Sequence, residues 1–334
     1  MSITTDGCTR DPDLWFDDGN LVIQVTSRLF RVHRGVLAFS SNYFRDMINF
    51  PKTQEQDTYE DVPLIALHDD DPRDAAEFLK ALYMPYYFPA PPAKTTFETL
   101  EGVLRLAHKY DVPALRRCAL KHLSTSFPTD LGEISKCQNH PLRPYTYLEV
   151  DRLPELMAVA SLAHEVHAKW LLPAVFLDTL QFDAVALGSS REWRGRRRYF
   201  THADLVQCFH GRDALHKKIP FSLFISPCVA GPPDHCLLAK TRCFDEDDVV
   251  TYHRYPLTYF TEWMVRNSDK PFCQPCQDDM GTKYAQWLDD TWAMLPKVFG
   301  LPDWDKLLEL KRQDMGLVPV SSSTNKDGVQ MNQD

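Results

Sequence analysis

The chain has 334 residues, of which 44% are hydrophobic and 12% aromatic, and its formal net charge at pH 7 is −9. That length can hold two ordinary domains, and that composition excludes a chain that is disordered throughout. The acidic balance provides no overall attraction to nucleic acid or to an anionic membrane surface. The 9 cysteines are too sparse and too unevenly spaced for a disulfide scaffold. Residues 1–13 are polar, and proline and aspartate interrupt the apolar stretch 171–187, so we expect no signal peptide and no membrane span. A cytoplasmic or nuclear protein with reduced thiols fits these features.

The first part of the chain shows the patterns of two strands followed by helices. The apolar run 21–25 predicts a buried strand, and the alternation over 29–32 predicts a half-exposed second strand after a turn at 26–28. Ser41 is the expected N-cap of a helix, because its hydroxyl can accept a hydrogen bond from an N–H of the first turn. The polar stretch 49–61 predicts a loop.

The next part predicts one more strand and a series of helices. The strand is expected at 64–67, before an acidic turn. Thr95 and Glu98 have the spacing of a capping box, which predicts that Thr95 is the N-cap of a helix. Hydrophobic residues at helical spacing cover 75–83, 97–107 and 115–122.

Between the first two of these helices lies a proline-rich segment, residues 84–93, which predicts a stiff exposed loop. Its aromatic residues Tyr86, Tyr87 and Phe88 have two interpretations. They either form a hot spot for a protein partner, because aromatic side chains bring a large contact area, or fold back on their own domain. Phe50 and Glu55, in the predicted loop 49–61, are further partner-binding candidates.

A family pattern runs through the first part of the chain. It reads Asp-x-x-Leu, then Phe-x-x-His-(Lys/Arg)-x-x-Leu, then Ser-x-x-Phe, and its positions are held by Asp18, Leu21, Phe30, His33, Arg34, Leu37, Ser41 and Phe44. The segment Ala107–Leu115, which includes Tyr110, is similar to the family's Ala-x-Lys-Tyr-x-(Val/Ile)-x-x-Leu. Residues 13–127 therefore resemble a BTB/POZ domain, a protein-interaction module. The resemblance implies an α+β fold, in which a short, mainly three-stranded sheet packs with helices ahead of a mainly α-helical domain.

His33 is the signature residue closest to a chemical role. It is either a general base or pH switch, or a polar core residue whose ring bonds the backbone or Asp18. The resemblance favours the polar core residue, so we predict no catalytic residue in this part of the chain.

The resemblance also implies protein partners. BTB homodimers usually rest on a strand and helix exchanged between chains, and only about a dozen residues precede Trp15, too few for that whole element. Dimerisation would therefore use the remaining helices. Many BTB proteins are instead substrate adaptors of cullin-based ubiquitin ligases, and their cullin contact is a hydrophobic residue, any residue, then Glu. Here Thr53-Gln54-Glu55 lacks the hydrophobic residue.

The rest of the chain is expected to form a second domain. Thr201 is a predicted N-cap, and Gly211 is the predicted end of the same helix.

The stretches Asp11–Asn20 and Phe30–Leu37, with the paired cysteines and tryptophan-rich closing helices, resemble a large fungal (mushroom-type) family of BTB proteins. The expected division is a tail at 1–12, the BTB/POZ domain at 13–127, a linker at 128–154, a helical domain at 155–315 and a disordered tail at 316–334.

The pair Cys273-Gln274-Pro275-Cys276 has three interpretations: half of a structural zinc site, a redox dithiol, or incidental thiols. The sequence lacks the strand and helix pattern of a thioredoxin-like unit before this pair. For zinc, the other half would come from Cys228, Cys236 and Cys243, with His235 and His253 as alternatives. The zinc candidates are Cys236, Cys243, Cys273 and Cys276, and no other cofactor is expected.

Residues Arg191–Arg198 form the densest basic run, with interleaved aromatic residues. The run is either a nuclear-import signal or nucleic-acid contact, or a solvated surface loop between two helices. Because the chain is acidic, we favour the surface loop and expect no nucleic-acid partner.

The leading hypothesis is a non-enzymatic interaction protein that self-associates or docks a partner. The alternatives are a cullin adaptor and, with less support, a Cys-x-x-Cys oxidoreductase.

Overall fold

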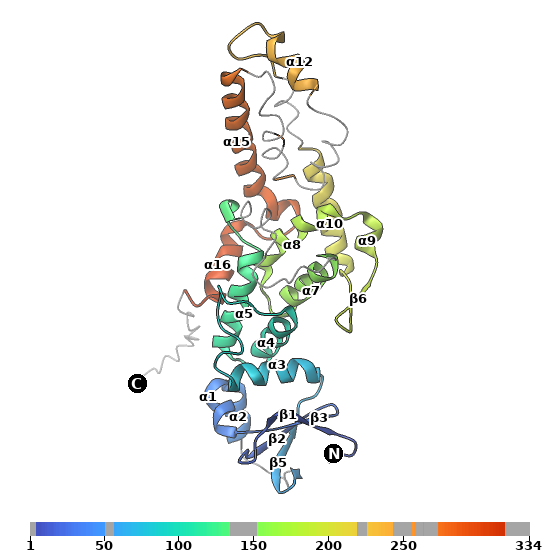
Figure 1. The fold of residues 1–334 in the computed structure, drawn as a ribbon, viewed down its shortest axis with the longest axis vertical. Helices are drawn as coiled ribbons and strands as arrows, with labels where there is room; N and C mark the ends of the chain where they lie inside the picture. The colour runs from blue at the N-terminus through green and yellow to red at the C-terminus, as the bar shows by residue number, and fades with distance from the viewer. Residues whose placement is uncertain are drawn as a thin grey trace, which may run out of the picture.

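The computed structural model describes residues 5–50, 57–133, 152–218, 226–242, 256–257, 263 and 273–317. The predictions for Glu55, Cys243, most of the linker and the tail beyond 317 lie outside these residues. The described chain is elongated, with a β-sheet at one end and α12 (Asp234–Arg242) at the other (Figure 1).

The sheet has five strands in the order β1-β3-β2-β5-β4. The central hairpin pairs β2 and β3 antiparallel, whereas β1 joins β3 and β5 joins β2 in parallel. The strands are β1 (Thr9–Trp15), β2 (Leu21–Val25), β3 (Arg28–Val32), β4 (Thr58–Tyr59) and β5 (Val62–Ala66). The hairpin and β5 correspond to the expected strands. Most of β1 was expected to belong to the N-terminal tail, and β4 was expected to belong to the loop 49–61.

The prediction of an exposed face on β3 is wrong. Leu29 is fully buried, and it packs with Val22 and Leu64 on the face of the sheet that Trp15 partly covers. The other face carries Phe30 and packs against helices. Apolar residues on both faces of β3 are therefore buried, and only Arg28 and Arg31 of this strand keep partial contact with water.

Helices cover the second face of the sheet. Ser41 caps α2 as predicted, because its hydroxyl accepts a hydrogen bond from the N–H of Phe44. The N-cap of α4 is Thr96, one residue after the predicted Thr95, because the Thr96 hydroxyl accepts the N–H of Thr99. The helices are α1 (Arg34–Ser40), α2 (Asn42–Asn49), α3 (Pro72–Tyr83), α4 (Phe97–Lys109) and α5 (Pro113–Ser126).

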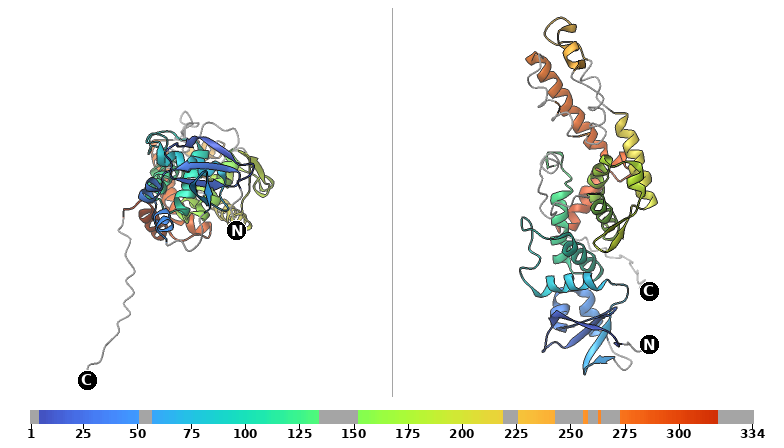
Figure 2. Two further views of the ribbon diagram at one scale, coloured as in Figure 1. Left: turned by 90° about the horizontal axis from the view of Figure 1, so that it is seen from below. Right: turned by 45° about the vertical axis from the view of Figure 1, so that its right-hand side comes forward.

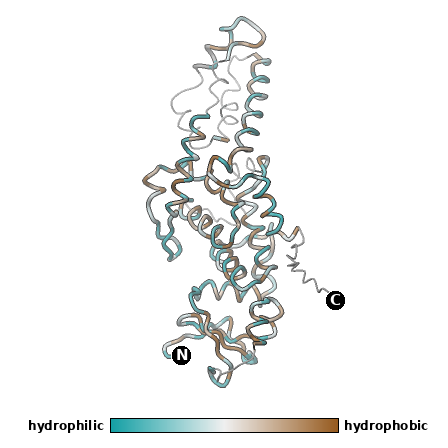
Figure 3. The backbone as a smooth tube through the Cα atoms, turned by 180° about the vertical axis from the view of Figure 1, so that it is seen from behind, coloured by the Kyte–Doolittle hydropathy of each residue, from teal (hydrophilic) through white to brown (hydrophobic). Residues whose placement is uncertain are grey.

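The region after α5 is mainly helical, with one hairpin. Its α-helices are α7 (Arg152–Glu165), α8 (Leu172–Asp178), α9 (Ala184–Gly188), α10 (His202–His216), α12, α15 (Gln274–Val298) and α16 (Trp304–Asp314). Two 3-10 helices, η1 (Lys169–Leu171) and η2 (Thr179–Gln181), flank α8. The hairpin of β6 (Arg191–Trp193) and β7 (Arg196–Arg198) stands out as a hydrophilic segment in Figure 3. The helix α15 runs from the central helices to the end where α12 lies (Figure 2). The α+β class, with a helical region after the BTB-like part, is therefore confirmed.

One hydrophobic core joins the two parts of the chain. It contains Leu104 of α4 and Leu120 of α5 together with Leu156 of α7, Phe176 of α8 and Phe299. The BTB-like part and the helical region therefore share buried apolar surface, which opposes their separation in water.

The helix α10 begins as predicted but ends later. Thr201 and Asp204 form a capping box. Gly211 lies inside the helix, which continues to His216. At Gly211 a Cβ atom would lie 2.1 Å from a ring carbon of Phe299, so this glycine permits a close packing contact and does not end the helix. Within the described part of the chain, no helix combines the length and the apolar character required to cross a membrane.

Candidate functional site

The apolar signature residues are part of the core between the sheet and its helices. Leu21, Phe30, Leu37 and Phe44 are all buried there. Their role is to pack the fold, because none of them reaches the surface.

Two polar signature residues connect elements that are distant in sequence. The Ser41 hydroxyl donates to the carbonyl of Tyr110, which fixes the start of α2 against the end of α4. The Tyr110 hydroxyl donates to Asp70. Burial and this carboxylate both raise the pKa of Tyr110, so the phenol stays protonated.

Two further polar signature residues, His33 and Asp18, contact each other. Nε2 of His33 lies 3.2 Å from Oδ1 of Asp18, the partner that the sequence suggested. The backbone N–H of His33 donates to the Tyr83 hydroxyl at 2.7 Å, and the His33 imidazole packs against the ring of Phe16. His33 therefore links the end of β3 to α3, although its ring is half-buried and does not lie in the core.

Three aromatic side chains are exposed along α1 and α2. Phe39 is 92% exposed, Tyr43 48% and Phe50 73%. Tyr43 lies in the first turn of α2, and Phe50 is the C-cap of the same helix. We call Phe39, Tyr43 and Phe50 the exposed aromatic face.

The proline-rich loop before α4 divides its aromatic residues between the two interpretations. Tyr86 is exposed, as a docking residue requires. Phe88 is buried in the shared core, and the half-buried Tyr87 donates its hydroxyl hydrogen to Glu77 at 2.6 Å. Phe88 is therefore withdrawn as a docking candidate, because its ring is already in contact with the protein's own core.

The arginine-rich hairpin packs against the BTB-like part. Arg198 forms a bidentate pair with Glu101 of α4, at 2.7 and 2.8 Å. Arg196 lies 2.6 Å from Asp74 of α3 and 3.2 Å from Glu101. Arg105 contacts both of these carboxylates, at 2.6 and 2.9 Å. We call Asp74, Glu101, Arg105, Arg196 and Arg198 the ionic joint. The expectation of a solvated loop is wrong, because buried carboxylates hold the hairpin arginines.

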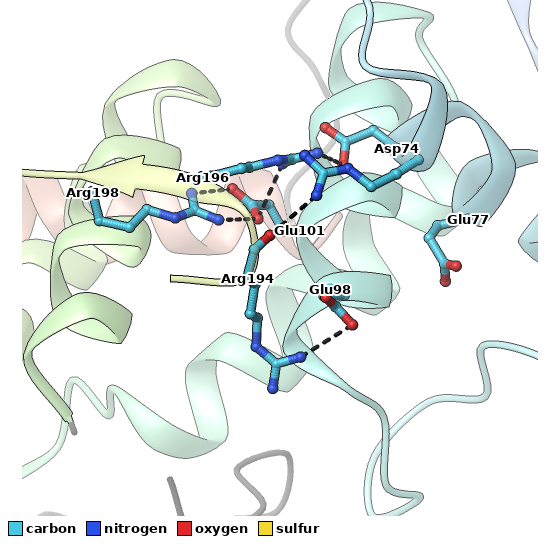
Figure 4. Close-up of a pocket in the computed structure, with 8 residues that line it drawn as sticks. Asp74, Glu77, Glu98, Glu101, Arg194, Arg196 and Arg198 are labelled. Carbon is cyan, nitrogen blue, oxygen red and sulfur yellow. Dashed lines mark hydrogen bonds and ion pairs between the residues drawn. The ribbon is translucent and has the colours of Figure 1, made fainter. Parts of the chain in front are cut away.

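The ionic joint borders an open cleft of about 160 Å³ (Figure 4). Equal numbers of arginine and acidic side chains line the cleft, and most of them already pair with one another. It therefore presents no net charge that would select an ionic ligand. The lining residues are Arg73, Asp74, Glu77, Glu98, Glu101, Arg194, Arg196 and Arg198.

The acidic centre of the ionic joint is Glu101. Burial alone would raise the pKa of its carboxyl group. The guanidinium groups of Arg198, Arg105 and Arg196 outweigh burial and lower the pKa from 4.5 to about 2. Glu101 is therefore ionised at any pH at which the protein is expected to be folded.

This lowered pKa makes folding depend on pH. Because the folded value lies below the unfolded one, the carboxylate stabilises the fold fully above about pH 4.5, and this contribution disappears as the pH falls through about 2. Its size is on the order of 3 kcal/mol. Urea unfolding at several pH values between about 7 and 3 should show this loss, and Glu101→Gln should flatten the dependence. Equal slopes for the wild type and the variant would contradict the assignment.

A second group of side chains gathers at the opposite end of the molecule. The Sγ atoms of Cys228, Cys236, Cys273 and Cys276 all lie within 4.8 Å of one another. Cys273 is the N-cap of α15 and Cys276 lies in its first turn, whereas Cys236 belongs to α12 and Cys228 to the segment before it. The structure thus brings together Cys236, Cys273 and Cys276, three of the four predicted zinc candidates, with Cys228, whereas Cys243 lies outside the described residues.

The thiols of this cluster have different acidities in the absence of a cation. A hydrogen bond from the Ala230 backbone lowers the pKa of Cys228 to about 6. Burial raises the pKa of Cys236 to about 12. Some of these sulfur atoms are therefore thiols at neutral pH unless a positive charge is bound among them.

Residues 16–126 match the family model of the BTB/POZ domain. Neither the comparison with curated proteins nor the comparison with solved structures gave a match. The matched range covers the strands and helices from β2 to α5, and it contains the signature residues described above. Residues 16–126 therefore form a BTB/POZ domain, which is a protein–protein interaction module.

Proposed function

We propose that this protein is a non-enzymatic scaffold whose BTB/POZ domain self-associates through the exposed aromatic face. The observation that carries the proposal is the exposure of Phe39 on α1, Tyr43 on α2 and Phe50 at the C-cap of α2. Large aromatic side chains that stay exposed in the single chain are typical of interface centres, because burial on association removes their apolar surface from water.

The shared core and the ionic joint extend this proposal to the helical region. Arg105 contacts Glu165 of α7 at 2.8 Å as well as Asp74 and Glu101 of the BTB/POZ domain. A dimer formed through α1 and α2 would therefore hold two helical regions in a fixed orientation. Such a scaffold could present two copies of whatever surface the helical region offers.

Phe39→Ser should weaken the dimer without unfolding the chain, because the ring makes little contact with its own protein. A hot-spot loss of about 2 kcal/mol corresponds to a Kd about thirtyfold higher. The measurement is size exclusion with light scattering over a range of concentrations. The matched control is Val185→Ser, since Val185 is also highly exposed but lies on α9. Equal weakening by both variants, or a wild type that remains monomeric at high concentration, would overturn the proposal of self-association.

The same experiment tests the cullin-adaptor alternative when a cullin amino-terminal domain is added. A heavier complex that Phe39→Ser abolishes would assign the exposed aromatic face to a cullin and not to a second copy of the chain. A dimer whose mass does not change on addition of the cullin supports the scaffold. The sequence 53–55 lacks the hydrophobic residue of the usual cullin contact, which favours the scaffold outcome.

A further inference from the structure

We propose that Cys228, Cys236, Cys273 and Cys276 bind one zinc ion that fastens α12 and the segment before it to the start of α15. This site is independent of the exposed aromatic face, because it lies at the other end of the elongated molecule (Figure 1).

The distances fit a mononuclear site. Zinc–sulfur bonds of about 2.3 Å in a tetrahedron place the sulfur atoms about 3.8 Å apart. The Sγ atoms of Cys228 and Cys273 are 3.7 Å apart, and no pair in the cluster is separated by more than 4.8 Å. These distances are too long for a disulfide bond, whose sulfur atoms are about 2 Å apart. They are also short for an iron–sulfur cluster, in which the thiolates bind different iron atoms.

Groups around the sulfur atoms fit thiolate ligands. The Val229 N–H donates to Sγ of Cys276 and the Cys273 N–H donates to Sγ of Cys236, both at 3.4 Å. A ring nitrogen of His235 lies 3.2 Å from Sγ of Cys236. Hydrogen bonds of this kind orient metal ligands and reduce the charge on their sulfur atoms. The first turn of α15 adds the positive end of the helix dipole next to Cys273 and Cys276.

A buried ammonium group lies close to the cluster in sequence. Lys240 is fully buried, one helical turn after Cys236 on α12, and its Nζ contacts the carbonyl and hydroxyl oxygens of Ser226. Both oxygens are neutral, whereas a buried cation is stabilised by negative charge. A zinc ion with four thiolates carries a net charge of about −2 and would supply that charge. A buried ammonium group on the same helix as Cys236 is consistent with a negatively charged site at this end of the molecule.

Zinc also fits the position of the site in the fold. The ligands come from α12, from the segment before it and from α15, and these elements are separated along the chain by residues 243–272. A tetrahedral ion would fix α12 and the segment before it to the start of α15, as structural zinc sites fix separate segments in small domains. This role differs from redox catalysis, in which a Cys-x-x-Cys pair must remain open to attack.

The test uses the full-length chain expressed with added zinc and purified under reducing conditions. Elemental analysis should find about one zinc ion per chain, and Cys276→Ser and Cys228→Ser should each lose it. Cys8→Ser is the control, because Cys8 lies next to the sheet at the other end of the molecule, and it should retain the ion. Cobalt added to the metal-free protein should give the thiolate charge-transfer and d–d bands of a tetrahedral sulfur site.

A second measurement covers the case in which a cysteine variant does not fold. A strong chelator added to the wild type should remove the zinc, make the four cluster thiols reactive towards alkylation and make α12 more accessible to protease. All 9 cysteines should then titrate as free thiols. Folded wild-type protein without metal, a thiol count reduced by disulfide formation, or iron in place of zinc would each overturn the proposal.

Discussion

Replacing Glu101 with glutamine should lower the free energy of unfolding by about 3–5 kcal/mol. The substitution preserves the size of the side chain and removes its charge. Arg198, Arg105 and Arg196 all contact the Glu101 carboxylate, so the variant leaves guanidinium groups that face one another without their shared counter-charge. Breaking a buried ion pair on one side is costly, because the remaining charge stays desolvated.

Glu98→Gln is the matched control for this prediction. Glu98 lies on the same helix and pairs with Arg194 of the same hairpin at 3.1 Å, but its side chain is 57% exposed whereas that of Glu101 is 3% exposed. An exposed pair contributes about 0.5 kcal/mol or less. Urea unfolding of both variants gives the comparison, and a double-mutant cycle of Glu101→Gln with Arg198→Met isolates their coupling. Similar small losses for both glutamates would show that the ionic joint does not stabilise the fold.

Local sequence signals were sufficient for most of the BTB/POZ domain. The Ser41 cap, the apolar run in β2 and the helical spacing in α3 depend on neighbours within a few residues, so the sequence displays them directly. The strand β1 was missed because its sequence TRDPDLW is mostly polar and shows little alternation. Its formation depends on an edge of β3 that only the folded sheet provides.

The ionic joint could not be predicted from spacing. Glu101 and Arg198 are 97 positions apart, and a glutamate among apolar helix positions gives no sign of its partner. A local signal for the hairpin does exist in Arg194-Gly195. Both residues have positive φ, 53° and 66°, as the two central residues of a type I′ turn require. The glycine of Arg194-Gly195, which lies between the short runs that form β6 and β7, was therefore the local hairpin signal that the sequence analysis missed.

The cysteine cluster was predicted in part, because only two of its four members are close together in the sequence. The spacing of Cys273 and Cys276 places both residues at the start of one helix. The other cysteines of the cluster are more than 30 residues away in the sequence. Sequence separation alone does not determine which of Cys228, Cys236 and Cys243 approaches that helix. Sequence reasoning therefore identified the local pair of the cluster and also named Cys236, whereas its fourth candidate, Cys243, lies outside the described residues.

Gly211 allows helix propensity and packing to be compared in a single substitution. Alanine stabilises an exposed helix interior relative to glycine by about 1 kcal/mol, so propensity alone predicts that Gly211→Ala is stabilising. The alanine Cβ, however, would lie 2.1 and 2.2 Å from two ring carbons of Phe299, which is fully buried against Phe176. Overpacking of this kind costs about 1–3 kcal/mol or more, so we expect a net loss of about 2 kcal/mol in the free energy of unfolding.

Gly281→Ala supplies the opposite sign within the same protein. Gly281 lies in α15 and a Cβ atom there would have no neighbour within 4 Å, so only propensity acts and the variant should be more stable by about 0.5–1 kcal/mol. Thermal and urea unfolding of both variants measure the two effects. Adding Phe299→Leu to Gly211→Ala should cost less than the sum of the single losses, because the smaller side chain makes room for the new methyl group. If both alanine variants were stabilising, the close contact between α10 and Phe299 would be wrong.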